Sequence, residues 1–423
     1  MRVHVIGAGL AGLAASLALA DAGLRVALYE AGPAAGGRCR SYFDRQIGAR
    51  IDNGNHLLLS GNRAAYAYLR RLGTEATLAG PPAPIFPFFD RADGTRWQLR
   101  PGRSRLPWWI FAPSRRVPGT SPGDYLALRH VLRARGETRV ADLPLAPQLA
   151  RRLITPLAIA ALNTMPEIGS ASLLGAVVGE TLARGGAACI PAFPRDGLSE
   201  SFIDPALAAL AAGGSEIFLA RRVTALTTRD GAVGAIATTA GPADFAPGDQ
   251  VVLAVPPWIA AELLPGLTVP DAFEMILNLH FRLHADPGPA GFWGVIGGVA
   301  EWVFVKPGIV SVTISAANRF ADTPPETLAE AVWGDVAAVL GVAGAIPPCL
   351  PPWRLVRERR ATFLASPEQN RRRPGPETGL ANLLLAGDWT ATGLPATIEG
   401  AIRSGNLAAQ GIIERVLRHA ARH

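Results

Sequence analysis

Lysine and cysteine are both scarce in this chain of 423 residues. Lys306 is the only lysine, so nearly all of the positive charge is carried by arginine. The three cysteines, Cys39, Cys189 and Cys349, are odd in number and widely separated, and no CxxC pair occurs. We therefore expect neither a disulfide framework nor a zinc site, and this usage favours a reducing compartment.

Long uncharged apolar runs and nucleic-acid motifs are also missing. Residues 3–20 are apolar except for His4, but their glycine spacing argues against a signal peptide. No other stretch approaches the roughly 18 apolar residues of a membrane-spanning helix. No RNP-type motif or compact arginine and aromatic stretch occurs. The net charge of +7 therefore favours an anionic membrane surface or a diphosphate as partner, and we expect no nucleic acid.

The start of the chain carries a dinucleotide-binding fingerprint. A short apolar run ends at Gly7, and Gly9 and Gly12 complete a GxGxxG motif. A helix-forming segment without proline follows over 10–22, and a second apolar run closes at Glu30. The glycines allow a tight turn, close approach of a pyrophosphate and close helix packing, and the acid binds ribose hydroxyls. The spacing predicts a strand–helix–strand unit that binds a dinucleotide.

A second glycine-rich segment decides between NAD and FAD. Gly36, Gly37 and Arg38 resemble the glycine doublet and basic residue that follow the fingerprint in the amine oxidase and phytoene desaturase flavoenzymes. The glycine pair allows the backbone to approach a cofactor, and Arg38 can meet pyrophosphate or flavin. The resemblance implies that FAD is the cofactor.

The end of the chain resembles the closing segment of the same superfamily. An apolar run precedes Gly387 and Asp388, and a helical stretch over 401–417 follows Thr397 and Ile398. In the superfamily the aspartate contacts ribitol or pyrophosphate, and the N-terminus of the helix stabilises negative charge on reduced flavin. The resemblance therefore implies that Asp388, Thr397 and Ile398 lie at the flavin.

The middle of the chain completes the predicted fold. By the same resemblance, Val223 would place its backbone near adenine, and 254–256 would form the turn under the cofactor. We expect an α/β protein with a discontinuous FAD-binding, Rossmann-like domain of the glutathione-reductase type and a discontinuous α+β substrate domain. The predicted FAD-binding domain comprises 1–60, 195–262 and 375–423. The predicted substrate domain comprises 61–194 and 263–374.

Further blocks resemble the hydroxysqualene dehydroxylases, a family within that superfamily. Residues 52–59 read DNGNHLLL, close to the family's DNGxHxLL, although Asn55 stands where many relatives have glutamine. Other matching blocks lie at 161–167, 197–206, 359–363 and 387–405. The similarity covers essentially the whole chain, whereas 81–120 matches no block of the family.

The resemblance implies a reaction in which hydroxysqualene, a C30 prenyl alcohol, and reduced FAD give squalene, water and oxidised FAD. The hydroxyl is next to a double bond, so its loss as water leaves an allylic cation that a hydride from flavin N5 quenches. Such a site needs an acid near the hydroxyl and an apolar tunnel. Because no second GxGxxG occurs, we expect an external electron donor to reduce the flavin.

Three residues are candidates for the acid: His56, Asp52 and Glu167. By superfamily analogy, Gly54 and Asn55 run close to the isoalloxazine together with His56. A carboxylic acid in an apolar tunnel would have a raised pKa and could protonate a hydroxyl. The structural alternatives are a turn or cap residue for Asp52, a core histidine for His56 and a helix-start acid for Glu167.

Two other functions compete with this interpretation. A carotenoid or phytoene-type desaturase shares the fold and a prenyl substrate but runs the flavin in the opposite direction. A non-catalytic prenyl-binding protein of the GDP-dissociation-inhibitor type shares the fold without flavin, and Glu30, Arg38 and Asp388 argue against it. An amine oxidase is disfavoured because Thr397 stands where those enzymes commonly place an aromatic residue.

One segment suggests contact with a membrane. Residues 107–113 (PWWIFAP) are apolar and aromatic, and arginines flank them on both sides, at 100, 103, 105, 115 and 116. Tryptophan with neighbouring arginines is typical of docking to anionic headgroups, although a buried turn is the alternative. We expect a cytoplasmic protein that binds transiently to the inner face of the cytoplasmic membrane. The run Arg371–Arg373 is predicted to be a solvated surface.

Overall fold

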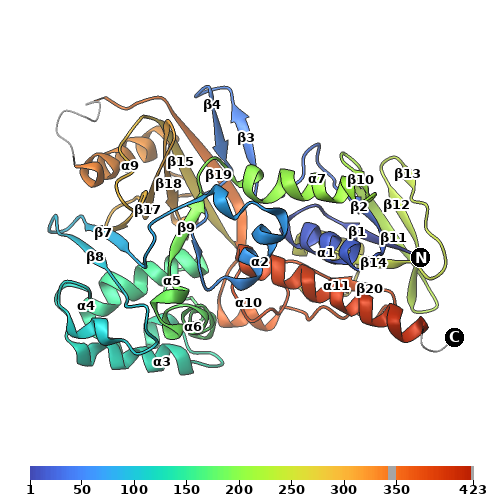
Figure 1. The fold of residues 1–423 in the computed structure, drawn as a ribbon, viewed down its shortest axis with the longest axis horizontal. Coiled ribbons are helices and arrows are strands. Elements are labelled where there is room, and N and C mark those ends of the chain that lie inside the picture. The colour runs from blue at the N-terminus through green and yellow to red at the C-terminus, as the bar shows by residue number, and fades with distance from the viewer. Residues whose placement is uncertain (342–348, 421–423) are drawn as a thin grey trace.

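The computed structural model describes residues 1–341 and 349–420, which form two lobes bridged by long strands (Figure 1). The segments 342–348 and 421–423, parts of the ranges 263–374 and 375–423 predicted above, lie outside the described residues. Both ends of the chain lie at the far end of one lobe (Figure 1).

That lobe is built on the predicted N-terminal unit. A parallel pair of strands is joined by α1 (Leu10–Asp21), and three further strands extend the pair on both sides. In spatial order the sheet comprises β10 (Glu216–Phe218), β2 (Arg25–Tyr29), β1 (Arg2–Ile6), β14 (Gln250–Leu253) and β20 (Leu383–Leu385). Every pair is parallel, so both faces must be covered, and all five strands fall in the ranges predicted for the FAD-binding domain.

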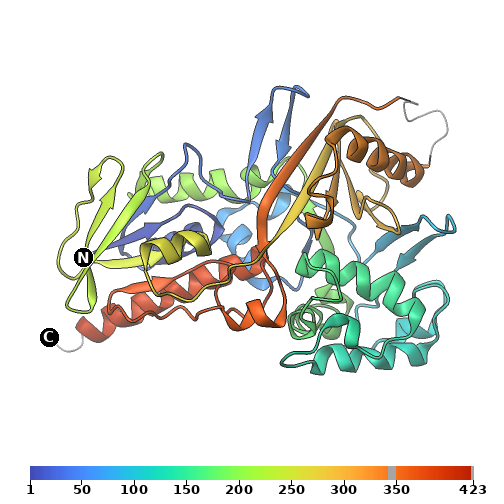
Figure 2. The same cartoon turned by 180° about the vertical axis from the view of Figure 1, so that it is seen from behind.

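Helices cover one face of this parallel sheet and a small sheet covers the other. α11 (Ile398–Ala420) lies beside α1, so close that a side chain on Gly405 would meet the Ala11 carbonyl oxygen at 2.1 Å (Figure 1). On the opposite face lie α8 (Pro257–Leu263) and an antiparallel sheet, visible from behind (Figure 2). Its strands are β11 (Val223–Arg229), β12 (Ala232–Thr238) and β13 (Gly241–Pro242).

The second lobe contains a mixed sheet of seven strands. In spatial order they are β19 (Trp353–Phe363), β15 (Phe273–Arg282), β18 (Ile309–Ile314), β17 (Trp302–Lys306), β16 (Phe292–Ile296), β7 (Phe86–Asp90) and β8 (Arg96–Leu99). All seven come from the ranges predicted for the substrate domain. α9 (Pro325–Leu340) buries its apolar side on this sheet.

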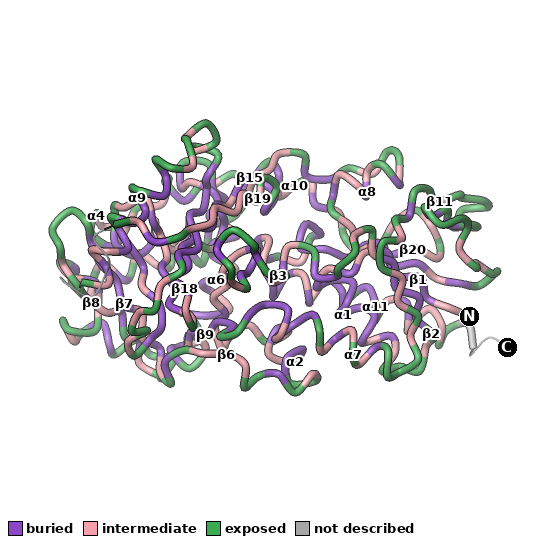
Figure 3. Tube along the Cα trace, turned by 90° about the horizontal axis from the view of Figure 1, so that it is seen from above, coloured by how far each residue is buried: buried purple, intermediate pink, exposed green. Residues whose placement is uncertain are grey.

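Shorter elements connect the two lobes. The hairpin β3 (Ser41–Asp44) and β4 (Ala49–Asp52) stands between the lobes (Figure 1), and β9 (Pro191–Pro194) pairs with β5 (Leu58–Leu59) and β6 (Leu78–Ala79). The remaining helices are α2 (Arg63–Leu72), α3 (Leu128–Arg133), α4 (Pro147–Leu149), α5 (Thr155–Leu162), α6 (Ala171–Glu180), α7 (Asp204–Ala212) and α10 (Pro367–Arg371). Buried positions concentrate in the central strands and in α1 and α11 (Figure 3). Within 1–341 and 349–420, no helix has both the length and the apolar character to cross a bilayer.

Candidate active site

The fingerprint glycines form an open cradle where β1 and β14 end. Gly7 has a φ of +106°, and a side chain there would lie 2.5 Å from the Ala254 carbonyl oxygen. A side chain on Gly12 would lie 1.8 Å from the Gly7 carbonyl oxygen. A side chain on Gly9, in contrast, would have no atom within 4 Å. Gly7 and Gly12 therefore fix the turn, and Gly9 leaves room for a pyrophosphate to approach the start of α1.

Glu30 closes this cradle at the end of β2. Its carboxylate accepts hydrogen bonds from the backbone N–H groups of Ala8 at 3.0 Å and Gly32 at 2.8 Å. The Glu30 carbonyl accepts the Arg221 N–H at 2.8 Å, which brings the start of β11 beside it. Val223, two residues further on, is buried at the first position of β11. The predicted ribose-binding acid and the predicted adenine-side residue are thus brought to one corner of the sheet.

The second glycine segment brings the N-terminal and C-terminal motifs together. The Gly36 N–H donates to the Ala8 carbonyl at 2.8 Å, and Gly37, with a φ of +58°, lies against Gly9. The guanidinium of Arg38, from the N-terminal motif, forms an ion pair with the carboxylate of Asp388, from the C-terminal motif, at 2.7 Å. Because Asp388 is buried, its charge needs this partner, and the pair fixes Arg38 over the cradle.

The residues after Asp388 set the start of α11. Thr397 caps the helix, because its Oγ1 accepts the Gly400 N–H at 3.0 Å, and Ile398 is buried as the first helical residue. The preceding loop is held by Trp389, whose Nε1 donates to the Val255 carbonyl at 2.9 Å. Asp388, Thr397 and Val255 therefore lie at the edge of the sheet where the strands end, the usual ligand site of such sheets.

For Arg373 the prediction of a solvated surface is wrong. Arg371 is exposed, but Arg373 is buried, and its guanidinium donates to the carbonyls of Asp388, Trp389 and Thr390. Burial lowers the pKa of Arg373 to about 10, although the negative charge of Asp388 acts to raise it. The sequence of three consecutive arginines does not indicate that Arg373 holds the backbone after Asp388, because only the tertiary fold buries one of the three.

Asp52 is held by three groups at the end of β4. Its Oδ1 accepts hydrogen bonds from Ser41 Oγ at 2.6 Å and the Leu198 N–H at 2.9 Å, and its Oδ2 lies 2.5 Å from Lys306 Nζ. Burial alone would raise the pKa of Asp52, but Lys306 and these hydrogen bonds hold it below its usual value. Asp52 is thus a carboxylate, and the expectation of an acid with a raised pKa does not hold for it.

A buried polar network supports the loop that follows Asp52. The Asn55 side chain donates to Ser311 Oγ at 2.8 Å and Thr313 Oγ1 at 3.1 Å. Asn278 accepts from Thr313 and donates to the Asn53 carbonyl at 3.2 Å. A side chain on Gly54 would crowd the Asn278 amide at 3.2 Å. The sheet of the second lobe therefore positions the loop, a contact that the sequence pattern did not reveal.

His56 and Glu167 have different surroundings. Burial lowers the pKa of His56 to about 4, so its imidazole is neutral near pH 7, and no described residue hydrogen-bonds its ring. Glu167 is exposed after α5, and only its carbonyl takes part in a described hydrogen bond, with Arg139. The structure brings Asp52 and His56 to one loop and does not link Glu167 to it.

Lys306 is a residue of the candidate site that the sequence analysis did not predict. It lies at the β17–β18 turn, with its side chain 11% exposed, and it pairs with Asp52 from a strand 254 positions away. Its being the one lysine of the chain was the available signal.

The cradle, the Arg38–Asp388 pair and the sheet order are those of a flavoenzyme. The chain belongs to the flavin-containing amine oxidoreductase family, whose model matches residues 10–284 and 304–413. A putrescine oxidase variant of known structure has the same fold, with a TM-score of 0.70 at 16% identity over 98% of this chain and 99% of that one. The chain is therefore an oxidoreductase that uses FAD.

Within that family, the chain is similar to the hydroxysqualene dehydroxylases over nearly its whole length. It is 52% identical over 415 residues to the hydroxysqualene dehydroxylase of Rhodopseudomonas palustris, covering 97% of this chain and 98% of the relative. It is 48% identical over 409 residues to the hydroxysqualene dehydroxylase of Sinorhizobium fredii, covering 96% of this chain and 97% of the relative. These identities place the chain among the hydroxysqualene dehydroxylases.

Proposed function

We propose that this chain removes the hydroxyl group of hydroxysqualene, a C30 prenyl alcohol, and replaces it with hydrogen to give squalene and water. The observation that carries the proposal is the 52% identity to a hydroxysqualene dehydroxylase over 97% of the chain. The complete cofactor cradle around Gly9, Glu30 and Asp388 supports it, since reduced FAD bound there supplies the hydride.

The chain's own residues must assist departure of the hydroxyl. The hydroxyl oxygen would take a proton that originates from solvent water as its C–O bond breaks, so that water departs and leaves an allylic cation. Hydride supplied by reduced FAD would complete the replacement of the C–O bond by a C–H bond. We assign His56 to meet the hydroxyl: its imidazole, neutral near pH 7, would donate its N–H to the hydroxyl oxygen and relay a proton from water, and no described residue hydrogen-bonds its ring. Asp52 supports the loop from one side, held as a carboxylate by Lys306. Exclusion of water from the cation falls to Leu57, the neighbour of His56 in the chain, and to the apolar cluster around Phe193 against which Leu57 packs.

An anaerobic single-turnover experiment tests the reaction. Photoreduced enzyme mixed with hydroxysqualene should yield squalene, identified by mass, while the flavin absorbance returns to that of the oxidised form. Oxidised enzyme under the same conditions should yield none. Formation of a more unsaturated product by the oxidised enzyme, with no squalene from the reduced enzyme, would instead identify a desaturase.

Two partners complete the proposal. Since the sequence has one dinucleotide fingerprint, an external donor reduces the flavin. The segment 106–111 docks on the inner face of the cytoplasmic membrane, where the substrate dissolves. Leu106, Trp108 and Phe111 are 59%, 66% and 61% exposed, and exposed arginines flank them. Trp109 and Ile110, in contrast, are buried and anchor the segment.

A further inference from the structure

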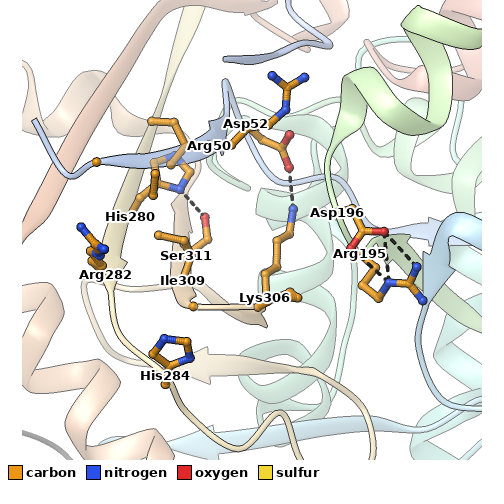
Figure 4. Close-up of a pocket in the computed structure, with 15 residues that line it drawn as sticks. Arg50, Asp52, Arg195, Asp196, His280, Arg282, His284, Lys306, Ile309 and Ser311 are labelled. Carbon is orange, nitrogen blue, oxygen red and sulfur yellow. Dashed lines mark hydrogen bonds and ion pairs between the residues drawn. The ribbon is translucent and has the colours of Figure 1, made fainter. Parts of the chain in front are cut away.

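A cavity of about 320 Å³ lies between the β3–β4 hairpin and the β17–β18 turn (Figure 4). Its basic side chains come from four separate segments of the chain: Arg50, Arg195, Arg282, Lys306, His280 and His284. Two carboxylates, Asp52 and Asp196, also line it. Arg195 pairs with Asp196, Lys306 with Asp52, and Arg50 with Glu200, which lies outside the lining. Arg282 is then the cation of the wall that no described carboxylate offsets, so the cavity favours an anion.

Two of the arginines are available to a ligand. The Arg282 guanidinium donates to the Ile47 carbonyl at 3.1 Å and forms no ion pair with a carboxylate of the described residues. Arg195 pairs with its neighbour Asp196, but the two side chains are 53% and 47% exposed, and such exposed pairs contribute little stability. Both guanidinium groups can therefore turn toward an anion at small cost, and a guanidinium matches phosphate oxygens with two parallel N–H donors.

His280 adds a buried donor on the same wall. Asn55 donates to Ser311 Oγ, so the Ser311 hydroxyl is free to donate to His280 Nδ1 at 2.8 Å. That arrangement puts the ring proton on Nε2. His280 is 1% exposed, and although the main chain of Asp52 lies beside the ring, Nε2 has no hydrogen-bond partner among the described residues. An unpartnered buried donor is costly, and a ligand oxygen would satisfy it.

We propose that this cavity binds a phosphate group, either that of the nicotinamide nucleotide that reduces the flavin or that of free phosphate or diphosphate. The inference deepens the proposed function, which requires an external reductant. The wall of the cavity includes Asp52, the residue immediately before the loop 53–56, which we expect to run close to the flavin. A nucleotide held in the cavity by its phosphate would therefore lie beside that loop. The chain's own dinucleotide fingerprint is taken by FAD, which leaves this cavity as a separate phosphate site.

Calorimetric titration of the FAD-loaded enzyme tests the site, with NADPH, NADH and inorganic diphosphate as separate ligands at low ionic strength. We expect NADPH to bind and Arg282→Gln to weaken it about tenfold, the effect of losing one charge-assisted contact. Arg229→Gln is the matched control, because Arg229 is an exposed arginine on β11 that pairs only with Asp230, outside the cavity. The flavin spectrum of each variant reports whether it is folded.

The ligands distinguish the sources of the phosphate. Binding of NADPH with no response to diphosphate supports the nucleotide, and binding of diphosphate that NADPH does not displace supports free phosphate. The proposal is overturned if none of the three ligands binds, or if Arg282→Gln and Arg229→Gln bind them equally. Photoreduced single turnover needs no nucleotide, so failure here leaves the dehydroxylation experiment unaffected.

Discussion

Lys306 and Asp52 form a buried ion pair in which each charge depends on the other. Their side chains are 11% and 4% exposed, so water can replace a lost partner only from the cavity that both line. Replacing Lys306 with methionine would leave the Asp52 carboxylate uncompensated. We expect Lys306→Met to lower the free energy of unfolding by roughly 3–5 kcal/mol. Urea denaturation measures the loss, and Lys306→Arg, which keeps the charge, should lose clearly less.

The same pair predicts how stability depends on pH. The folded-state pKa of Asp52 lies below that of the unfolded chain, about 3.9 for aspartate. Its stabilising contribution is therefore present above pH 4 and is lost as the pH falls through the folded pKa. In Lys306→Met the loss on acidification should be smaller, because without the ammonium the folded-state pKa of Asp52 rises toward or above that of the unfolded chain. Parallel stability curves of the two proteins between pH 5 and 3 would refute this account.

His56 is the residue whose replacement should separate chemistry from cofactor binding. Its ring is not part of the cradle, so His56→Ala should keep FAD, but turnover should fall about 10²- to 10⁴-fold. Glu167→Gln is the matched control, because Glu167 is exposed and no described interaction links it to the loop. Normal turnover of His56→Ala with bound FAD, equal to that of Glu167→Gln, would refute the assignment.

At the scale of elements, the approach of α11 to α1 depends on one glycine. A methyl group on Gly405 would lie 2.1 Å from the Ala11 carbonyl, so Gly405→Ala must push the helices apart. We expect a loss of roughly 1–3 kcal/mol, typical of overpacking. Gly334, on α9, has nothing within 4 Å of the corresponding position, so Gly334→Ala should stabilise by about 0.4–1 kcal/mol. Thermal unfolding of both variants tests whether Gly405→Ala lowers the stability and Gly334→Ala raises it.

Local elements were predictable because their causes are local. Glycine spacing and apolar runs predicted β1, α1 and β2 to within about one residue at each end. The motifs proposed to hold FAD could be recognised as well, since each of them is contiguous in the sequence. Pairings such as Lys306 with Asp52 or Arg373 with its carbonyls join distant parts of the chain, and no local pattern encodes them.

At the scale of the whole molecule, the proposed membrane contact must be made by a surface segment, because no helix of 1–341 and 349–420 could cross a bilayer. The exposed 3₁₀ turn Trp108–Phe111 belongs to the second lobe, at a distance from the chain termini. Trp108 and Phe111 project outward and Trp109 does not, so a test must leave Trp109 in place to preserve the fold.

The double variant Trp108→Ser/Phe111→Ser should bind anionic liposomes at least about tenfold more weakly in sedimentation, because two large apolar side chains no longer enter the interface. Leu417→Ser is the control: Leu417 is 63% exposed, but it lies near the end of α11 on the other lobe. Binding should also fall with salt, since Arg103, Arg105 and Arg115 are exposed beside the turn. Equal sedimentation of the double variant and Leu417→Ser, with flavin spectra intact, would place the membrane contact elsewhere.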